Sequence, residues 1–354
     1  MATVSAFHKA MDKSSKKTVS AMHKQAIEAH GNYGTHNSKR LDSALKRTKL
    51  HHLIGNTLLT PSVHAKHSKN LGNRYLKRLE QVKSRAVKQG KAKAFDARSE
   101  FRFLTLIHTL EAPSISRVYK AIDKLKRDLT EATEKSAGIW LLGAIEIEVI
   151  SLEMMRQISS NRSVTEARKA DVCEGLLSRL PESMHDLKYY FLVHFHGIVQ
   201  ASSSSRFEKY YINLKQYKSW RSEARQIEMK NLSEHYGGKK KSAEKSLLDI
   251  ARYITKGGND WIGSKAYLRY KLSFDNELTE TEDGWISRNR KRNAELRREH
   301  QEEGLEDPLA MTAQEIADLA TVIDNLMSQA RGRTGYLVCA KSKRQLITTE
   351  QTAK

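Results

Sequence analysis

Residues 189–199, Tyr-Tyr-Phe-Leu-Val-His-Phe-His-Gly-Ile-Val, decide the fold, because they predict a buried β-strand that carries two histidines. Side chains alternate between the two faces of a strand, so His194 and His196 lie on one face and Phe195 on the other. Two imidazoles in an otherwise apolar strand cost desolvation free energy unless a partner compensates them. A divalent metal is one such partner, and hydrogen bonds within the core are the alternative.

The charge of the chain indicates a polyanionic partner. The 354 residues carry a formal net charge of +21 and have a pI of about 9.8. Residues 1–100 hold 21 Lys and Arg against 6 Asp and Glu, so most of the excess charge lies there. Nucleic acid is the simplest partner, with basic side chains at its phosphates. No amphipathic helix joins a basic face to a Trp, Phe and Leu face, so a membrane surface fits less well.

Cysteine usage and hydrophobic runs exclude several classes of protein. Cys173 and Cys339 lie far apart without Cys-x-x-Cys spacing, which excludes a disulfide framework and a cysteine-based zinc site. No apolar run reaches membrane-spanning length, and residues 1–24 do not resemble a signal peptide. We therefore expect a cytoplasmic protein without a membrane partner.

Hydrophobic periodicity predicts an α+β domain over residues 99–275. Residues 1–98 are expected to form a basic, helical and partly mobile DNA-binding extension, and residues 276–354 a helical C-terminal extension. The segment 206–241 mixes aromatic and basic side chains, which suits unpaired bases or ordinary packing. The expected strands cover 101–108, 139–150 and 189–199, and the expected helices cover 114–135, 163–180, 242–256 and 313–330.

Two of these elements carry further polar side chains in a regular pattern. Glu146 and Glu148 lie two residues apart in the strand 139–150 and therefore share one of its faces. Asp249, Tyr253 and Lys256 follow the i, i+4, i+7 spacing and therefore form one stripe along the helix 242–256.

The order of these strands, helices and polar motifs along the chain resembles that of the HUH endonuclease superfamily, and more narrowly that of plasmid and phage rolling-circle replication initiators. The resemblance covers about residues 100–275. It rests on four stretches, which are Phe103-Leu104-Thr105-Leu106, Gly143 to Val149, His194-Phe195-His196, and Arg252-Tyr253-Ile254-Thr255-Lys256.

The resemblance implies an RRM-like or ferredoxin-like antiparallel sheet with helices packed on it. It also implies a metal-dependent, sequence-specific endonuclease that nicks single-stranded DNA and transfers the strand through a phosphotyrosine intermediate. The expected partners are single-stranded or hairpin origin DNA, a host helicase and a host polymerase, and the protein could form a homo-oligomer. A transposase with the same chemistry and a non-catalytic nucleic-acid-binding protein are the alternative functions.

On this resemblance, Tyr253 is the nucleophile, with Tyr267 and Tyr270 as rivals. Lys256 would stabilise the phenolate, whose pKa is ordinarily about 10. Asp249 lies where some initiators have a glutamate, and that glutamate resembles a general base that activates water.

The same resemblance makes His194 and His196 metal ligands, with Glu148 as the third. The expected cofactor is Mg²⁺ or Mn²⁺, which would polarise a phosphate oxygen. Other candidates for the third ligand are Glu146, His185 and Asp186, and the residues expected to contact nucleic acid are Lys239, Lys240, Lys241 and Arg252.

The chain also departs from the pattern of the family. It has no cysteine cluster before the first motif, although many plasmid initiators carry one. A second tyrosine four residues from the first is absent, because Asp249 and Gly257 occupy those positions.

Overall fold

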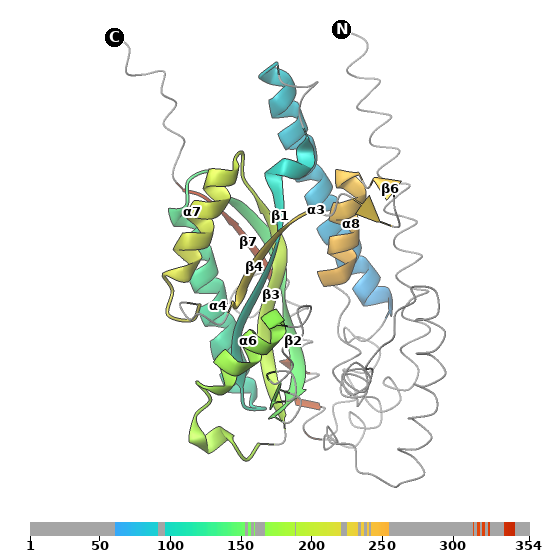
Figure 1. Cartoon of the computed structure of the whole chain (residues 1–354). Helices are drawn as coiled ribbons and strands as arrows, with labels where there is room; N and C mark the ends of the chain where they lie inside the picture. The colour runs from blue at the N-terminus through green and yellow to red at the C-terminus, as the bar shows by residue number, and fades with distance from the viewer. Residues whose placement is uncertain are drawn as a thin grey trace, which may run out of the picture.

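The fold is an α+β arrangement of a five-stranded antiparallel sheet with helices on it (Figure 1). Among the helices that the structure describes, none is both long and apolar enough to span a bilayer. The computed structural model describes residues 61–90, 96–152, 155–156, 159, 167–187, 189–220, 225–232, 235–236, 239–240, 242–254, 314, 317–318, 321–322, 325 and 336–343.

The main sheet has the strand order β4-β1-β3-β2-β7, and every neighbouring pair is antiparallel. The histidine-bearing strand β3 is central, and all 12 of its residues are buried, which confirms the sequence prediction for this stretch. The strands are β1 (Phe101–Glu111), β2 (Trp140–Ser151), β3 (Tyr189–Gln200), β4 (Ile227–Asn231) and β7 (Leu337–Lys341).

One face of the sheet is covered by α4 (Ile115–Lys135) and α7 (Ser204–Lys215). The helix predicted over residues 114–135 is confirmed as α4, and its apolar residues Val118, Ile122 and Leu125 are fully buried. The order β1–α4–β2–β3–α7–β4, with β3 between β1 and β2, is compatible with a ferredoxin-like fold. Between β2 and β3 the chain forms α6 (Ala167–Leu177) and a short 3₁₀ turn (Glu182–Met184).

The opposite face is covered by α3 (Pro61–Lys88) and α8 (Ala243–Ile254), as Figure 1 shows. The Tyr75 hydroxyl on α3 donates a hydrogen bond to the Leu142 carbonyl on β2, at 2.9 Å. α3 belongs to the segment that the sequence predicted to be an extension, yet it shares a hydrophobic core with the sheet. That core includes Leu71, Leu79 and Val82 of α3, Leu247 and Ala251 of α8, and Phe101, Leu142 and Ile198 of the sheet.

The C-terminal segment also reaches the sheet. β7 pairs with β2 and forms an edge of the sheet, although residues 276–354 were expected to be helical. The residues described between 314 and 325 are helical, as predicted, and Ala317 and Val322 are buried among them. Next to β7, Tyr336 lies 2.5 Å from the His67 ring of α3, measured from the hydroxyl to Nδ1.

Candidate active site

Three potential ligands meet on the face of the sheet that α3 and α8 cover. Glu146 on β2 pairs in register with His194 on β3, and His196 follows on the same face. The Glu146 Oε2 atom lies 3.3 Å from His194 Nε2 and 3.6 Å from His196 Nε2. Both histidines are buried, and the three potential ligand atoms all lie within 4.8 Å of one another.

This register corrects the sequence prediction for the third ligand. Glu148 lies two residues further along β2, opposite Leu192, and its side chain is exposed outside the group. His185 and Asp186 are also exposed, and neither belongs to the group. The structure therefore brings Glu146, and not Glu148, to the two histidines.

A hydrogen bond from β1 orients the second histidine. The Thr105 hydroxyl lies 3.1 Å from His196 Nδ1, and the two residues are register partners. When Nδ1–H donates to this hydroxyl, Nε2 keeps its lone pair for a ligand. The Glu146 carboxylate lies on that Nε2 side of the ring.

Two facing glycines hold the β2 and β3 backbones at this point. Gly143 and Gly197 are register partners, and the ring of Phe195 lies against both. A Cβ atom on Gly143 would lie 2.2 Å from the His196 carbonyl oxygen and 2.4 Å from Phe195 Cζ. Any side chain at this position would therefore displace the backbone that carries His196.

The donor set fits a divalent metal ion. Two neutral imidazoles and one carboxylate are ligand types that first-row divalent ions accept. They project from two neighbouring strands of the sheet, so their relative positions depend on backbone pairing rather than on a loop. The group formed by Glu146, His194 and His196, called the Glu-His-His cluster below, could therefore hold a metal ion.

An exposed tyrosine stands beside this cluster. The Tyr253 ring on α8 meets the His196 ring edge-on, with 5.5 Å between centroids. It also meets Phe103 edge-on at 6.0 Å, and Phe103 stacks on His196 at 5.7 Å. Tyr253 is 46% exposed, whereas Leu247, Leu248 and Ile254 on the same helix are buried. The structure therefore unites the predicted residues His194, His196 and Tyr253.

Phe103 and Thr105 were not assigned individual roles from the sequence. Both lie in the predicted first-strand motif, and their two-residue spacing places them on the same face of β1. The sequence could have identified both residues only if the pairing of Thr105 with His196 had been known in addition to the alternation of side chains along β1.

The other predicted site residues are only partly described. Asp249 lies half-buried one turn before Tyr253 on α8, and Arg252 is exposed beside it. Lys239 and Lys240 form strand β6, which pairs with β5 (His235–Tyr236). The predicted residues Lys241 and Lys256 lie outside the described part of the chain, as do the rival tyrosines Tyr267 and Tyr270.

The fold and site define an α+β protein with a candidate Glu-His-His metal centre next to an exposed tyrosine. Comparisons of the chain with protein-family models, curated proteins and solved structures gave no match.

Proposed function

We propose that this protein is an HUH-type endonuclease and strand transferase that nicks single-stranded DNA and starts rolling-circle replication of a plasmid or phage. The observation that carries the proposal is the position of Tyr253 beside His196, at the edge of the Glu-His-His cluster. This arrangement places a candidate nucleophile next to three side chains that can bind a metal ion.

The arrangement of the elements supports the proposal. The two-histidine motif lies on the central strand β3, between β1 with the first-strand motif and β2 with Glu146. The tyrosine helix α8 covers the same face of the sheet as the histidines. This is the arrangement that the resemblance to rolling-circle initiators implies for a ferredoxin-like sheet.

The proposed reaction exchanges one phosphoester for another. The Tyr253 phenol oxygen attacks phosphorus and loses its proton, the bond from phosphorus to the 3′ oxygen breaks, and that oxygen leaves as a 3′-hydroxyl. The 5′ phosphate stays on Tyr253, which preserves the bond energy for rejoining without ATP. Mg²⁺ or Mn²⁺ held by the cluster would neutralise charge on the phosphate. The free 3′-hydroxyl would prime synthesis by a host polymerase, with a host helicase unwinding the duplex.

The charge and exposure of the molecule suit this substrate. A net charge of +21 favours a polyanion, and a tyrosine that is 46% exposed can be reached by a strand of DNA. A transposase would use the same chemistry on transposon ends rather than on a replication origin.

A non-catalytic protein of the RNA-recognition type is a poorer fit. Such proteins stack bases on an exposed face of their sheet. Here α3 and α8 cover one face of the sheet, and α4 and α7 cover the other. That function would also leave the juxtaposition of Tyr253 and His196 without a role.

The proposal is tested by incubating the full chain with a random pool of single-stranded oligonucleotides and Mn²⁺. We expect a protein–DNA adduct that survives denaturing electrophoresis and disappears with EDTA or in Tyr253→Phe. The variants Tyr267→Phe and Tyr270→Phe should keep the adduct. An adduct that persists in Tyr253→Phe would assign the nucleophile elsewhere, and an adduct that forms equally in EDTA would remove the metal from the mechanism.

A further inference from the structure

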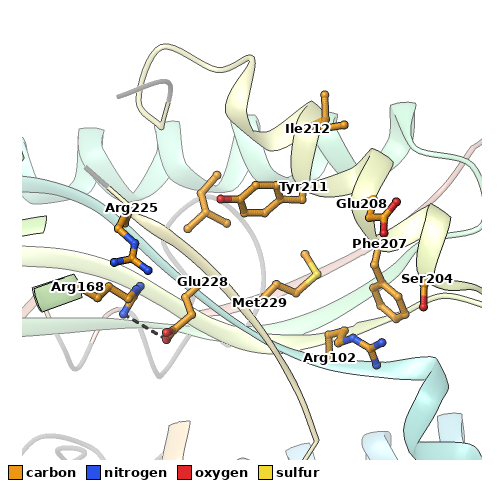
Figure 2. A pocket seen from close by; sticks show the side chains of 11 residues that line it. Arg102, Arg168, Ser204, Phe207, Glu208, Tyr211, Ile212, Arg225, Glu228 and Met229 are labelled. Atoms are coloured by element: carbon orange, nitrogen blue, oxygen red, sulfur yellow. Dashed lines mark ion pairs between the residues drawn. The ribbon is translucent and has the colours of Figure 1, made fainter. Parts of the chain in front are cut away.

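A concave site lies between α7 and the edge strand β4 (Figure 2). Its volume is about 690 Å³, which is within the range of small-molecule sites. The side chains that line it include Arg102, Arg168, Phe207, Tyr211, Arg225, Ile227, Glu228 and Met229.

Strand alternation places Arg102 and Met229 of this pocket on the face of the sheet opposite the Glu-His-His cluster, whereas Glu228 lies on the edge strand and pairs with Thr105 on the cluster's face. Arg102 pairs with Val199, and Met229 pairs with Leu104; both partners belong to the core beneath α4 and α7. His196 lies on the opposite face, under α8. A ligand held against Arg102 and Met229 would therefore lie across the sheet from the candidate metal centre.

Arginines from three separate elements converge on the pocket. Figure 2 shows Arg168 of α6 and Arg225, which precedes β4, at one end, and Arg102 of β1 at the other. Glu228 partly balances Arg168, at 3.2 Å, and Asp171 partly balances Arg225, at 3.5 Å. Both ends of the pocket therefore carry a guanidinium group, while Glu208 and Glu228 add two carboxylates to its lining.

Arg168 has hydrogen-bonding capacity that the described residues do not use. Its Nε and Nη2 atoms are buried without a hydrogen-bond partner among the described residues. These two atoms form one edge of the guanidinium fork, the geometry that binds phosphate or carboxylate in bidentate fashion. Burial lowers the pKa of Arg168, and also that of Arg102, below the usual value, so both cations are partly desolvated and an anion would stabilise them.

Between its two basic ends the pocket is aromatic and apolar. Figure 2 shows Tyr211 and Met229 between the arginines, with Phe207 near Arg102. The Arg102 guanidinium lies 4.6 Å from the centre of the Phe207 ring. Aromatic faces next to guanidinium groups suit the stacking of a nucleobase and contact with its phosphates.

We propose that this pocket binds one nucleotide unit of a single-stranded nucleic acid, with the base against Tyr211 and Met229 and a flanking phosphate toward each basic end. The proposal goes beyond the nicking function, because the pocket lies across the sheet from Tyr253 and requires no metal. A guanidinium at each end matches a unit inside a strand, which has a phosphate on both sides of its sugar.

The test is photo-cross-linking of the full chain in EDTA to oligothymidylate that contains 4-thiothymidine, with the cross-linked peptides mapped by mass spectrometry. We expect cross-links within residues 204–215 and 225–232. Tyr211→Ala should weaken binding, read from the concentration dependence of these cross-links, by roughly 5- to 150-fold, while Tyr211→Phe keeps the stacking ring and stays near wild type.

A charge variant tests the phosphate contact at an exposed position. Arg225→Gln should lower the slope of log affinity against log salt by about 1. Arg127→Gln is the matched control, because the two arginines have similar surroundings. The Arg127 side chain is 62% exposed and lies 4.0 Å from Asp123, and the Arg225 side chain is 59% exposed and lies 3.5 Å from Asp171. Equal slopes for the two variants would overturn the assignment.

Two further outcomes would overturn the proposal. Cross-links that map only outside residues 204–215 and 225–232 would show that the oligothymidylate does not bind in the pocket. If dTMP competes as well as oligothymidylate at equal nucleotide concentration, the pocket recognises a free nucleotide instead of a strand. Because EDTA prevents metal-dependent nicking, failure of the nicking function leaves these results interpretable.

Discussion

The Tyr253 ring of α8 meets the His196 ring of β3 edge-on, with 5.5 Å between centroids. α8 reaches this position because Leu247 and Ala251 bury their side chains in the core that it shares with α3 and the sheet. The packing of two helices on one sheet face thus determines where the candidate nucleophile stands relative to the candidate metal centre.

Metal affinity distinguishes the two glutamates of β2. Glu146→Gln should lower the affinity for Mn²⁺ by more than the roughly 10- to 100-fold that loss of an outer-shell partner costs, because it removes a charged ligand. Glu148→Gln is the matched control and should bind as wild type, since Glu148 faces Leu192 and is exposed. Titration calorimetry with Mn²⁺ measures both. Loss of affinity in Glu148→Gln alone would restore the assignment made from the sequence.

The hydrogen bond between Thr105 and His196 should also affect metal binding. Thr105→Val keeps the shape of the side chain but removes the hydroxyl 3.1 Å from Nδ1, so Mn²⁺ affinity should fall by roughly 10- to 100-fold. Thr109→Val on the same strand is the control, because its hydroxyl donates to the Leu110 carbonyl instead. Equal affinities in the two variants would show that the hydroxyl does not orient the ring.

The contrast between Glu146 and Glu148 shows what the sequence could predict about the site. Alternation placed both carboxylates on one face of a strand, and the His-x-His spacing placed both imidazoles on one face of the next. The pairing register between β2 and β3 selects Glu146, because it sets Glu146 opposite His194. Register depends on the whole sheet, so local sequence left the choice open.

Helix α3 should contribute to the stability of the sheet rather than act as a separate extension. Leu79→Ala removes a buried side chain from the core shared with α8, and should lower the free energy of unfolding by about 2–5 kcal/mol. Val87→Ala is the control on the same helix; Val87 is 62% exposed, so its loss should cost less than about 0.5 kcal/mol. Urea denaturation measures both. If Leu79→Ala is as stable as Val87→Ala, the packing of α3 does not contribute to the stability of the domain.

The role of α3 and β7 could not be predicted from sequence because their contacts are distant along the chain. Leu76, Leu79 and Val82 fall at helical spacing, which indicates a helix but not the surface on which that helix packs. β7 is a five-residue edge strand whose partner β2 lies far earlier in the chain. The long apolar strands, in contrast, carry strong local patterns, and their predicted bounds agree closely with β1, β2 and β3.

Buried His108 should make stability depend on pH. Desolvation, followed by the nearby charges of Lys124 and Arg179, lowers its pKa from 6.5 to about 3. Between these values the unfolded chain binds the proton and the folded chain does not, so the stability present above pH 6.5 is lost as pH falls toward 3.

Replacing this histidine tests the sign of the effect. Urea denaturation across this pH range should give His108→Leu a shallower loss of stability than wild type, by up to about 1.4 kcal/mol per pH unit. Parallel curves for the two proteins would mean that folding does not shift the pKa of His108.

The most direct measurement of the central claim is peptide mapping of the protein–DNA adduct formed with Mn²⁺ and single-stranded DNA. After nuclease and protease digestion, mass spectrometry should find a nucleotide linked through phosphate to Tyr253, in the peptide that contains Arg252 and Ile254. A link at another residue, or no covalent link while DNA is cut, would contradict the account.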